Sequence, residues 1–231
     1  TIHHCAQVAH SRAQGKIGSG FDVAAACFGS IEYRRFSPEH IEQFPKSADR
    51  KWDDFVRPLQ VPENLHLAFA TFPKESASTV SMVKTVKAWK KDHASEYAAI
   101  TRELNEANVN ALAHLEQYGL QGKREDLDAF RKHLEAGRAG TRELGQKSGA
   151  PIEPPELRTL IDQSLENGAF VCKSPGAGGR DALAALCLTK KDAEKLRVFW
   201  KTQGLLPLDV AGDHQGILDG QWAPSKNDRA L

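Results

Sequence analysis

Apolar positions in the first part of this chain follow two periods, one typical of helices and one typical of strands. Residues 1–13 repeat them every three or four positions, which predicts the end of an amphipathic helix. The apolar side of this helix carries Ile2, Cys5, Val8 and Ala9. Residues 30–36 instead alternate apolar with charged side chains, which predicts a strand. Between the two, an alanine-rich run predicts a helix that begins near Asp22.

Prolines and a second apolar run organise the next part of the chain. Prolines punctuate residues 37–64, which predicts a connector with one short helix at 38–44. The run LHLAFATF, residues 65–72, has the length and the apolar character of a buried strand. A helix is predicted from about Ser76, because hydrophobic residues recur at helical spacing after it.

From residue 94 to residue 149 the chain is highly charged and carries apolar stripes at helical spacing. A break at 119–122 divides this region into two helices, whose charges are interpreted as solvated faces with ion pairs between positions four residues apart. The elements expected after it are a helix at 156–167, strands at 169–173 and 182–188, a helix at 190–203 and a strand at 205–210. From residue 65 the order is therefore β-α-(helical insertion)-β-β-α-β, which predicts an α+β fold of the ferredoxin-like type.

The composition argues against several classes of partner. The chain has 231 residues and a formal net charge of +1, so no global field favours nucleic acid or a membrane surface. No apolar run approaches the roughly 18 residues of a membrane span. The four cysteines lie far apart and without CxxC spacing, which favours reduced thiols. We therefore expect a cytoplasmic protein.

Glycine, lysine and an acid crowd into residues 15–22, GKIGSGFD. Glycines such as Gly18 and Gly20 let the backbone come close to a ligand, and Lys16 supplies a point charge suited to phosphate. A carboxylate among these groups, that of Asp22, suits the orientation of a nucleophile or the binding of a metal ion. The alternative is a glycine-rich turn that Asp22 caps at a helix start, without any ligand.

Two further segments have the composition of anion-binding sites. Ser76, Ser78 and Thr79 crowd the first turn of a predicted helix, where hydroxyl groups either cap the helix or bind an oxyanion. A second glycine loop, residues 174–179, lies between two predicted strands. Together these segments are expected parts of a phosphate-handling cleft between two domains. The histidines near the start of the chain have no further ligand at zinc-like spacing, so we predict no metal site there.

Three strings of the sequence together resemble the phosphomevalonate kinases, which are members of the GHMP kinase superfamily. They are AQGKIGSGFDVAAACFGSIEYRRF at 13–36, KESASTVSMVKTVKAW at 74–89 and KSPGAGGRDALAAL at 173–186. The first string is highly specific, the second fairly specific, and the GAGG loop of the third points only to the superfamily. The proline before GAGG and the DAL after it look more like the fungal-type enzymes than the bacterial ones.

The resemblance implies transfer of the γ-phosphate of ATP, with Mg²⁺, to the small molecule 5-phosphomevalonate, giving 5-diphosphomevalonate in the mevalonate pathway of isoprenoid biosynthesis. It places the family's catalytic acid on Asp22 and its basic residue on Lys16. The substrate-binding positions that it implies are Gly18, Ser19, Gly20, Ser76, Ser78 and Thr79. The ATP-phosphate loop that it implies consists of Gly176, Ala177, Gly178 and Gly179.

Two departures from the superfamily pattern change this picture. Arg180 stands where many members carry another glycine, and its side chain could point to solvent or to a nucleotide phosphate. The superfamily's main ATP loop, a GLGSSA-type sequence, is absent from this chain. We therefore expect an incomplete and inactive portion of a longer kinase. In this interpretation residues 1–60 are the remainder of the N-terminal domain, and residues 61–231 are the ferredoxin-like C-terminal domain with a helical insertion.

Two alternatives stay open. One is another GHMP small-molecule kinase, such as a mevalonate kinase, although mevalonate kinases lack the combination of GKIGSGFD and YRRF. The other is a non-catalytic binding protein or remnant on the same fold, which the missing ATP loop favours. The sequence does not predict an oligomeric state.

Overall fold

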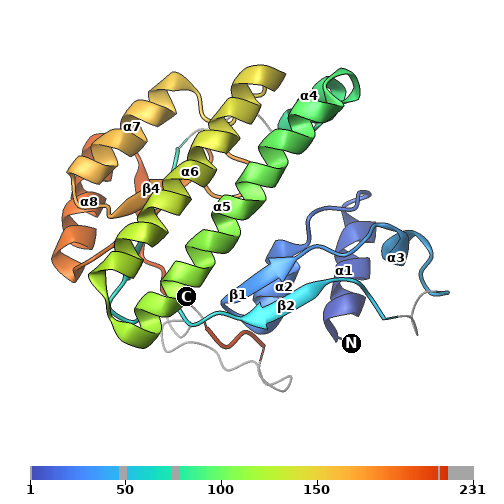
Figure 1. Ribbon diagram of the computed structural model, residues 1–231, viewed down its shortest axis with the longest axis horizontal. Coiled ribbons are helices and arrows are strands. Elements are labelled where there is room, and N and C mark those ends of the chain that lie inside the picture. The colour runs from blue at the N-terminus through green and yellow to red at the C-terminus, as the bar shows by residue number, and fades with distance from the viewer. Residues whose placement is uncertain (1, 47–50, 74–78, 213, 218–231) are drawn as a thin grey trace. The chain divides into compact units, whose positions relative to one another are not determined.

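A computed structural model describes residues 2–46, 51–73, 79–212 and 214–217 (Figure 1). The chain divides into two units, one formed by residues 1–60 with the segment from Gly212, the other by residues 61–211. The segment from Gly212 joins the first unit through contacts such as the hydrogen bond from the Ile217 amide to the Cys27 carbonyl oxygen, 3.3 Å. The division of the chain into domains at residue 60 stays a prediction.

The first unit combines short helices with a two-stranded sheet. Its elements in chain order are α1 (Ile2–Ala13), α2 (Phe21–Phe28), β1 (Ile31–Arg34), α3 (Glu39–Glu42) and β2 (Phe55–Pro58). A small core of Val8, Phe36, Ile41 and Trp52 holds them together. The helices and β1 lie where the sequence predicts them.

Strand β2 lies inside the region predicted to be a connector, and this prediction is wrong for residues 55–58. Strands β1 and β2 pair antiparallel, with Glu32 opposite Arg57. The Arg57 guanidinium lies 2.6 Å from the Glu32 carboxylate, a cross-strand pair of opposite charge that supports this register. These four residues form a strand because they pair with β1, and their own sequence carries no pattern that predicts it.

The buried side of α1 differs from the apolar side predicted for it. Ile2 is 75% exposed and Cys5 is exposed too. The residues that α1 buries are His3, Gln7, Val8 and Ser11. Polar side chains can occupy this side because they find hydrogen-bond partners inside the unit, as shown below.

The second unit is built on a four-stranded sheet. Its strands are β3 (His66–Thr71), β4 (Val171–Lys173), β5 (Ala182–Cys187) and β6 (Leu206–Leu208). Their order is β4-β5-β3-β6 and all neighbours are antiparallel. With α4 (Thr79–Asp92) after β3 and α8 (Lys190–Thr202) after β5, this confirms the predicted ferredoxin-like order of elements.

Helices α7 (Pro155–Glu166) and α8 bury their apolar sides against this sheet. Leu157 and Ile161 of α7, together with Leu196 and Trp200 of α8, belong to the same buried cluster as β3 and β5. The Trp200 indole N–H is satisfied in this core, because it donates to Ser164 Oγ at 2.9 Å.

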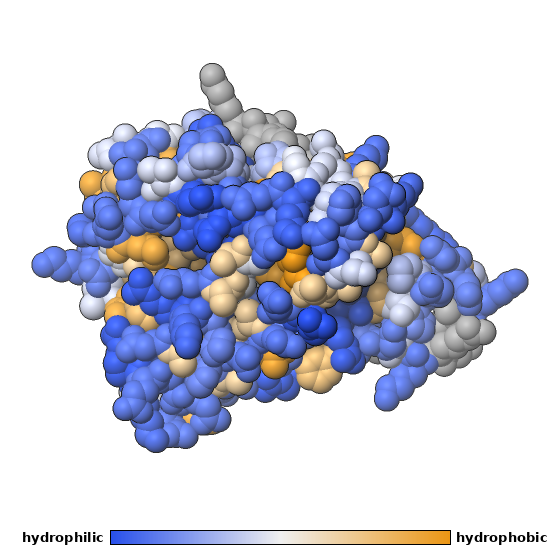
Figure 2. Space-filling view, turned by 45° about the horizontal axis from the view of Figure 1, so that its top comes forward, coloured by the Kyte–Doolittle hydropathy of each residue, from blue (hydrophilic) through white to orange (hydrophobic). Residues whose placement is uncertain are grey.

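The predicted helical insertion consists of two long helices, α5 (Ala94–Gln121) and α6 (Arg124–Ser148), which run side by side (Figure 1). The break between them is confirmed, since Gly122 ends α5 with a φ of 66°. Figure 2 shows a largely hydrophilic face of the protein, in which hydrophobic residues form small patches. The interpretation of all charges in this region as solvated is wrong for Arg138, whose side chain is only 11% exposed and pairs with Glu153.

Within the described ranges, no helix combines the length and the apolar character needed to cross a membrane.

Candidate functional site

The first glycine loop lies between α1 and α2 and ends at a glycine that no other residue could replace without strain. Gly20 stands at the N-cap of α2 with φ 75° and ψ 6°. A Cβ at this position would lie 2.8 Å from Gln7 Nε2. The left-handed backbone and the close side chain both require glycine.

Gln7 fixes the backbone of this loop from inside the unit. Its side chain is buried, and its amide Nε2 donates to the Gly20 carbonyl oxygen at 2.7 Å and to His3 Nε2 at 2.9 Å. Because His3 Nε2 accepts this bond, the ring proton lies on Nδ1, which faces Asp54 Oδ2 at 3.5 Å. A chain of polar contacts therefore runs from Asp54 through His3 and Gln7 to Gly20.

His3, His4 and Asp54 also satisfy the simplest geometric requirement of a metal site, since their ligand atoms all lie within 4.8 Å of one another. The hydrogen bonds assign a different role to this cluster. A proton on His3 Nδ1 leaves that atom without the lone pair that a metal ion needs. Burial also lowers the pKa of His3, an effect that outweighs the attraction of the nearby Asp54 carboxylate. We therefore interpret His3 as a neutral link between Asp54 and Gln7.

Tyr33 holds the same loop from β1. Its hydroxyl group donates to the Ser19 carbonyl oxygen at 3.1 Å. Burial, with a further contribution from the Asp54 charge, raises the pKa of Tyr33 to about 12, so the hydroxyl remains a donor at neutral pH. The carbonyl groups of Ser19 and Gly20 are thus both bound to side chains of the unit. These bonds fix the start of α2, where free N–H groups and the helix dipole favour an anion.

Asp22 lies in the first turn of α2 and has a partner that the sequence analysis did not identify. Its Oδ2 atom is 3.3 Å from Nε2 of His10, a residue of α1. The Asp22 side chain is 54% exposed and that of His10 is 36% exposed. The carboxylate is therefore accessible to a ligand while it faces an imidazole.

The other predicted site residues are Lys16 and Gly18 in the first unit and the hydroxyl residues at the start of α4 in the second unit. Lys16 is exposed and lies in the turn after α1, which ends at Ala13, with its amide bonded to the Ser11 carbonyl oxygen at 3.1 Å. A Cβ on Gly18 would meet no atom within 4 Å. Thr79 is the exposed first residue of α4, whereas Ser76 and Ser78 lie outside the described residues. The predicted hydroxyl cluster therefore stays a prediction.

The second glycine loop connects β4 to β5 in the other unit. Gly176, Gly178 and Gly179 have positive φ values of 65°, 88° and 77°. A Cβ on Gly178 would lie 2.6 Å from both Cγ2 and the carbonyl oxygen of Ile152. The Gly179 amide donates to the same carbonyl oxygen at 2.7 Å. The buried end of this loop, Gly178 and Gly179, therefore rests directly on the backbone of Ile152, whereas Ala177 is half-buried.

Arg180 follows this loop, and its side chain is 51% exposed. Its guanidinium carbon lies 5.1 Å from the centre of the Phe72 ring. Its Nη1 atom lies 3.9 Å from Glu156 Oε1. The residue thus stacks on an aromatic ring beside an acid of α7.

Comparison with known proteins gives a match to the family model "GHMP kinases C terminal" over residues 117–205. The phosphomevalonate kinase of Gibberella zeae is 33% identical over 94% of this chain and 53% of the relative. That of Candida albicans is 34% identical over 81% of this chain and 49% of the relative. The peroxisomal phosphomevalonate kinase of Arabidopsis thaliana is 29% identical over 94% of this chain.

The chain contains a GHMP kinase C-terminal domain and is a homologue of phosphomevalonate kinases. This confirms the resemblance inferred from the three sequence strings. The chain spans about half the length of these curated relatives. The glycine loop at 174–179 lies within the match to the GHMP kinase C-terminal model, whereas residues 16–22 lie outside it.

Solved structures agree with a GHMP kinase fold. The Lin0012 protein of Listeria innocua superposes with a TM-score of 0.74 and 25% identity, over 88% of this chain and 57% of the other. The phosphomevalonate kinase of Streptococcus pneumoniae, solved in complex with phosphomevalonate and AMPPNP, gives a TM-score of 0.63 at 24% identity. The superposition covers 87% of this chain and 57% of the Streptococcus pneumoniae chain.

Proposed function

We propose that the whole protein is a phosphomevalonate kinase, which transfers the γ-phosphate of ATP to 5-phosphomevalonate and forms 5-diphosphomevalonate. The observation that carries this proposal is the 33% identity to a phosphomevalonate kinase over 94% of the chain. The few residues left outside that alignment are too few to make up either unit, so the likeness extends to both. A shared fold alone would not distinguish 5-phosphomevalonate from other acceptors, because one fold supports many functions.

The role proposed for the first loop follows from the charge of the acceptor. A phosphate monoester has a second pKa of about 6, so it is largely a dianion at neutral pH. Bringing it to ATP requires positive charge more than a base. We assign this task to Lys16 and to the N-terminus of α2, with Gly18, Ser19 and Gly20 shaping the pocket. Ser76, Ser78 and Thr79 are proposed to bind the acceptor as well.

Asp22 is proposed to orient Lys16 and not to act as an obligatory proton acceptor. It is also the exposed carboxylate of this loop, and oxygen ligands of this kind suit Mg²⁺, which binds proteins through one or two carboxylates and the phosphates of a substrate. When bound, Mg²⁺ would neutralise phosphate charge. The loop formed by Gly176, Ala177, Gly178 and Gly179 is proposed to bind phosphates of ATP. Because the Gly179 amide already donates to the Ile152 carbonyl oxygen and the Gly178 amide to that of Pro175, we assign the phosphate contacts to the N–H groups of Gly176 and Ala177.

Acceptor specificity tests the proposal. ADP formation by the complete gene product is measured with 5-phosphomevalonate, with mevalonate and without an acceptor. We expect a rate that depends on 5-phosphomevalonate and on Mg²⁺, and a much lower rate with mevalonate. Preference for mevalonate would favour another GHMP kinase, and absence of ADP formation with every acceptor would favour a non-catalytic protein.

One specific observation supports the non-catalytic alternative for this chain by itself. Its 231 residues contain no GLGSSA-type sequence, and positioning of phosphates is most of what a phosphoryl-transfer enzyme contributes. We expect that the 231-residue chain alone forms no ADP at a useful rate.

A cytoplasmic location, a small-molecule substrate and the absence of nucleic-acid or membrane partners complete the proposal. The balanced charge of the chain supports the absence of nucleic-acid and membrane partners. The relative from Arabidopsis thaliana is named as peroxisomal, so that fractionation of cells into cytosol and organelles is the appropriate test.

A further inference from the structure

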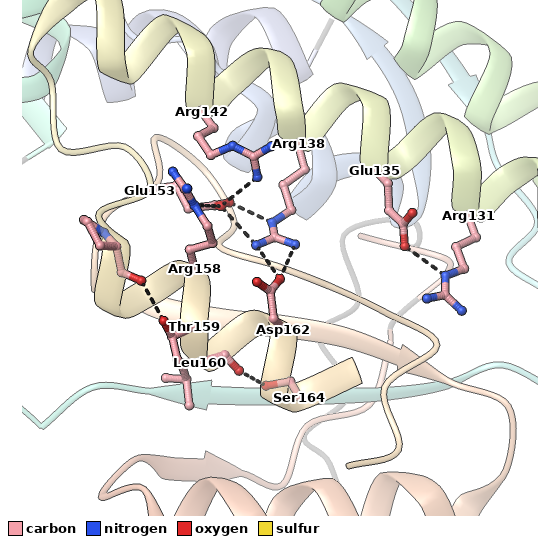
Figure 3. Close-up of polar contacts among 11 residues, drawn as sticks. Arg131, Glu135, Arg138, Arg142, Glu153, Arg158, Thr159, Leu160, Asp162 and Ser164 are labelled. Atoms are coloured by element: carbon pink, nitrogen blue, oxygen red, sulfur yellow. Dashed lines mark hydrogen bonds and ion pairs between the residues drawn. The ribbon is translucent and has the colours of Figure 1, made fainter. Parts of the chain in front are cut away.

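Arg138 and Glu153 form a buried ion pair in the second unit (Figure 3). The Arg138 side chain is 11% exposed and that of Glu153 is 7% exposed. Arg138 Nε donates to Glu153 Oε2 at 2.8 Å, and its Nη2 donates to Oε1 at 3.0 Å. This two-point contact fixes the direction of the carboxylate as well as its distance.

The Arg138 guanidinium joins three parts of the unit. It projects from α6 to Glu153, which lies in the segment before α7, and to Asp162 of α7. Both Nη1 and Nη2 lie 3.1 Å from Asp162 Oδ1. Burial alone would lower the pKa of Arg138, but the hydrogen bonds and charges of Glu153 and Asp162 raise it. The group therefore remains a cation at this junction.

Glu153 follows the residue on which the second glycine loop rests. The Ile152 carbonyl oxygen accepts the Gly179 amide at 2.7 Å, and Gly178 has no room for a Cβ against Ile152. On the other side, a Cβ on Gly145 of α6 would lie 3.2 Å from Ile152 Cβ. Ile152 is thus enclosed between α6 and the loop, and its neighbour is held by Arg138.

We propose that Arg138 is a positioning residue for the glycine loop at 174–179, because it holds Glu153 and thereby fixes Ile152 beneath Gly178 and Gly179. The part of this inference that concerns ATP rests on the proposed function. Replacement of a whole buried ion pair by apolar residues often leaves stability unchanged, whereas removal of one partner leaves the other charge buried and uncompensated. Without Arg138, the carboxylate would depend on longer contacts, to Arg142 at 3.5 Å and to Arg158 at 3.9 Å.

The test measures hydrogen exchange of the Gly179 amide by NMR in the 231-residue chain. The variants are Arg138→Ala, Arg138→Lys and Glu153→Gln. The control is Arg131→Ala, which removes an arginine of the same helix that pairs with Glu135 at 2.9 Å (Figure 3). The side chains of this pair are 41% and 47% exposed. The Phe170 amide, bonded to the Leu186 carbonyl oxygen at 2.8 Å, reports on global opening of the unit.

We expect Gly179 to exchange at least about tenfold faster in Arg138→Ala, and to a smaller extent in Arg138→Lys and Glu153→Gln. The rate of Phe170 should rise much less. Arg131→Ala removes a guanidinium that lies 5.5 Å from the centre of the Phe170 ring, and it should leave the Gly179 rate unchanged. If Gly179 and Phe170 accelerate equally, or if Gly179 is unchanged, Arg138 does not position the loop. The two conservative variants decide the question if Arg138→Ala does not fold.

Kinetics of the complete gene product separate this inference from the proposed function. Arg138→Lys should raise KM for ATP more than KM for 5-phosphomevalonate. Faster Gly179 exchange together with an unchanged KM for ATP supports the positioning of the loop and contradicts its proposed role in ATP binding. A raised KM for ATP with unchanged Gly179 exchange overturns the inference about Arg138.

Discussion

The carboxylate of Asp22 faces the imidazole of His10, with 3.3 Å between Oδ2 and Nε2, although the two residues belong to different helices. The candidate catalytic acid is therefore paired with a ring of α1 and not simply with solvent. The contact joins the two helices that flank the first glycine loop. It gives His10 a role that the search for metal ligands in the sequence did not suggest.

Loss of His10 should have a small effect on the reaction. Both side chains are substantially exposed, and exposed pairs contribute at most about 1 kcal/mol, which corresponds to roughly fivefold. We expect His10→Ala to lower kcat/KM by less than about fivefold. Steady-state kinetics of the complete gene product would measure this. A loss of several orders of magnitude would mean that His10 takes part in the chemistry.

Lys16 should matter more than Asp22. A charge-assisted hydrogen bond to phosphate contributes roughly 1.5–3 kcal/mol, so Lys16→Ala is expected to lower kcat/KM by about tenfold or more. Asp22→Asn keeps the size and some of the hydrogen bonding, and its cost should be smaller. Profiles of kcat/KM against pH should follow ionisation of the acceptor near neutrality in both wild type and Asp22→Asn. If Asp22→Asn removes an acidic limb of the profile, the fall in rate caused by protonation of a general base, and costs far more than Lys16→Ala, Asp22 is a general base.

The two loop glycines Gly18 and Gly20 should respond differently to the same substitution. Gly20→Ala places a Cβ 2.8 Å from Gln7 Nε2 at φ 75°, so it should cost about 1–3 kcal/mol of unfolding free energy. Gly18→Ala meets no atom within 4 Å and should leave stability nearly unchanged. If Gly18 shapes the acceptor pocket, Gly18→Ala should nevertheless raise KM for 5-phosphomevalonate. Denaturant titration and kinetics of the pair measure both effects, and an unaltered KM would remove Gly18 from the pocket.

Tyr33 makes stability depend on pH in the alkaline range. Its pKa is raised from 10.0 to about 12, so the folded state favours the neutral phenol. The resulting stabilisation is complete below pH 10 and is lost as pH rises from about 10 to about 12. Tyr33→Phe should lose less stability over this interval than wild type. Denaturant titrations of both proteins at several pH values measure the difference, and parallel curves would contradict the burial of this hydroxyl.

Much of the second unit could be predicted because its elements are long or strongly patterned. The order of elements could be predicted from the apolar runs of β3 and β5 and from the break at Gly122. The sheet order β4-β5-β3-β6 then follows from the ferredoxin-like arrangement. In contrast, β2 becomes a strand only through its pairing with β1, which no local pattern reveals.

The candidate site was predictable in its glycines but not in the side chains that hold them. Gln7 and His3 lie four residues apart on α1 and are both buried, so a polar stripe at helical spacing was the signal available in the sequence. That signal is ambiguous, because such stripes usually face solvent. Arg138 was interpreted as solvated for the same reason. Its partners Glu153 and Asp162 lie on later segments of the chain, so its own helix gives no sign of the ion pair.

The most direct test of the account is identification of the product by ³¹P NMR. The complete gene product is incubated with ATP, Mg²⁺ and either 5-phosphomevalonate or mevalonate. We predict that the phosphomonoester signal of 5-phosphomevalonate disappears as two coupled diphosphate signals and those of ADP grow, while mevalonate gives no new monoester. A new phosphomonoester formed from mevalonate, with 5-phosphomevalonate left unchanged, would contradict the account.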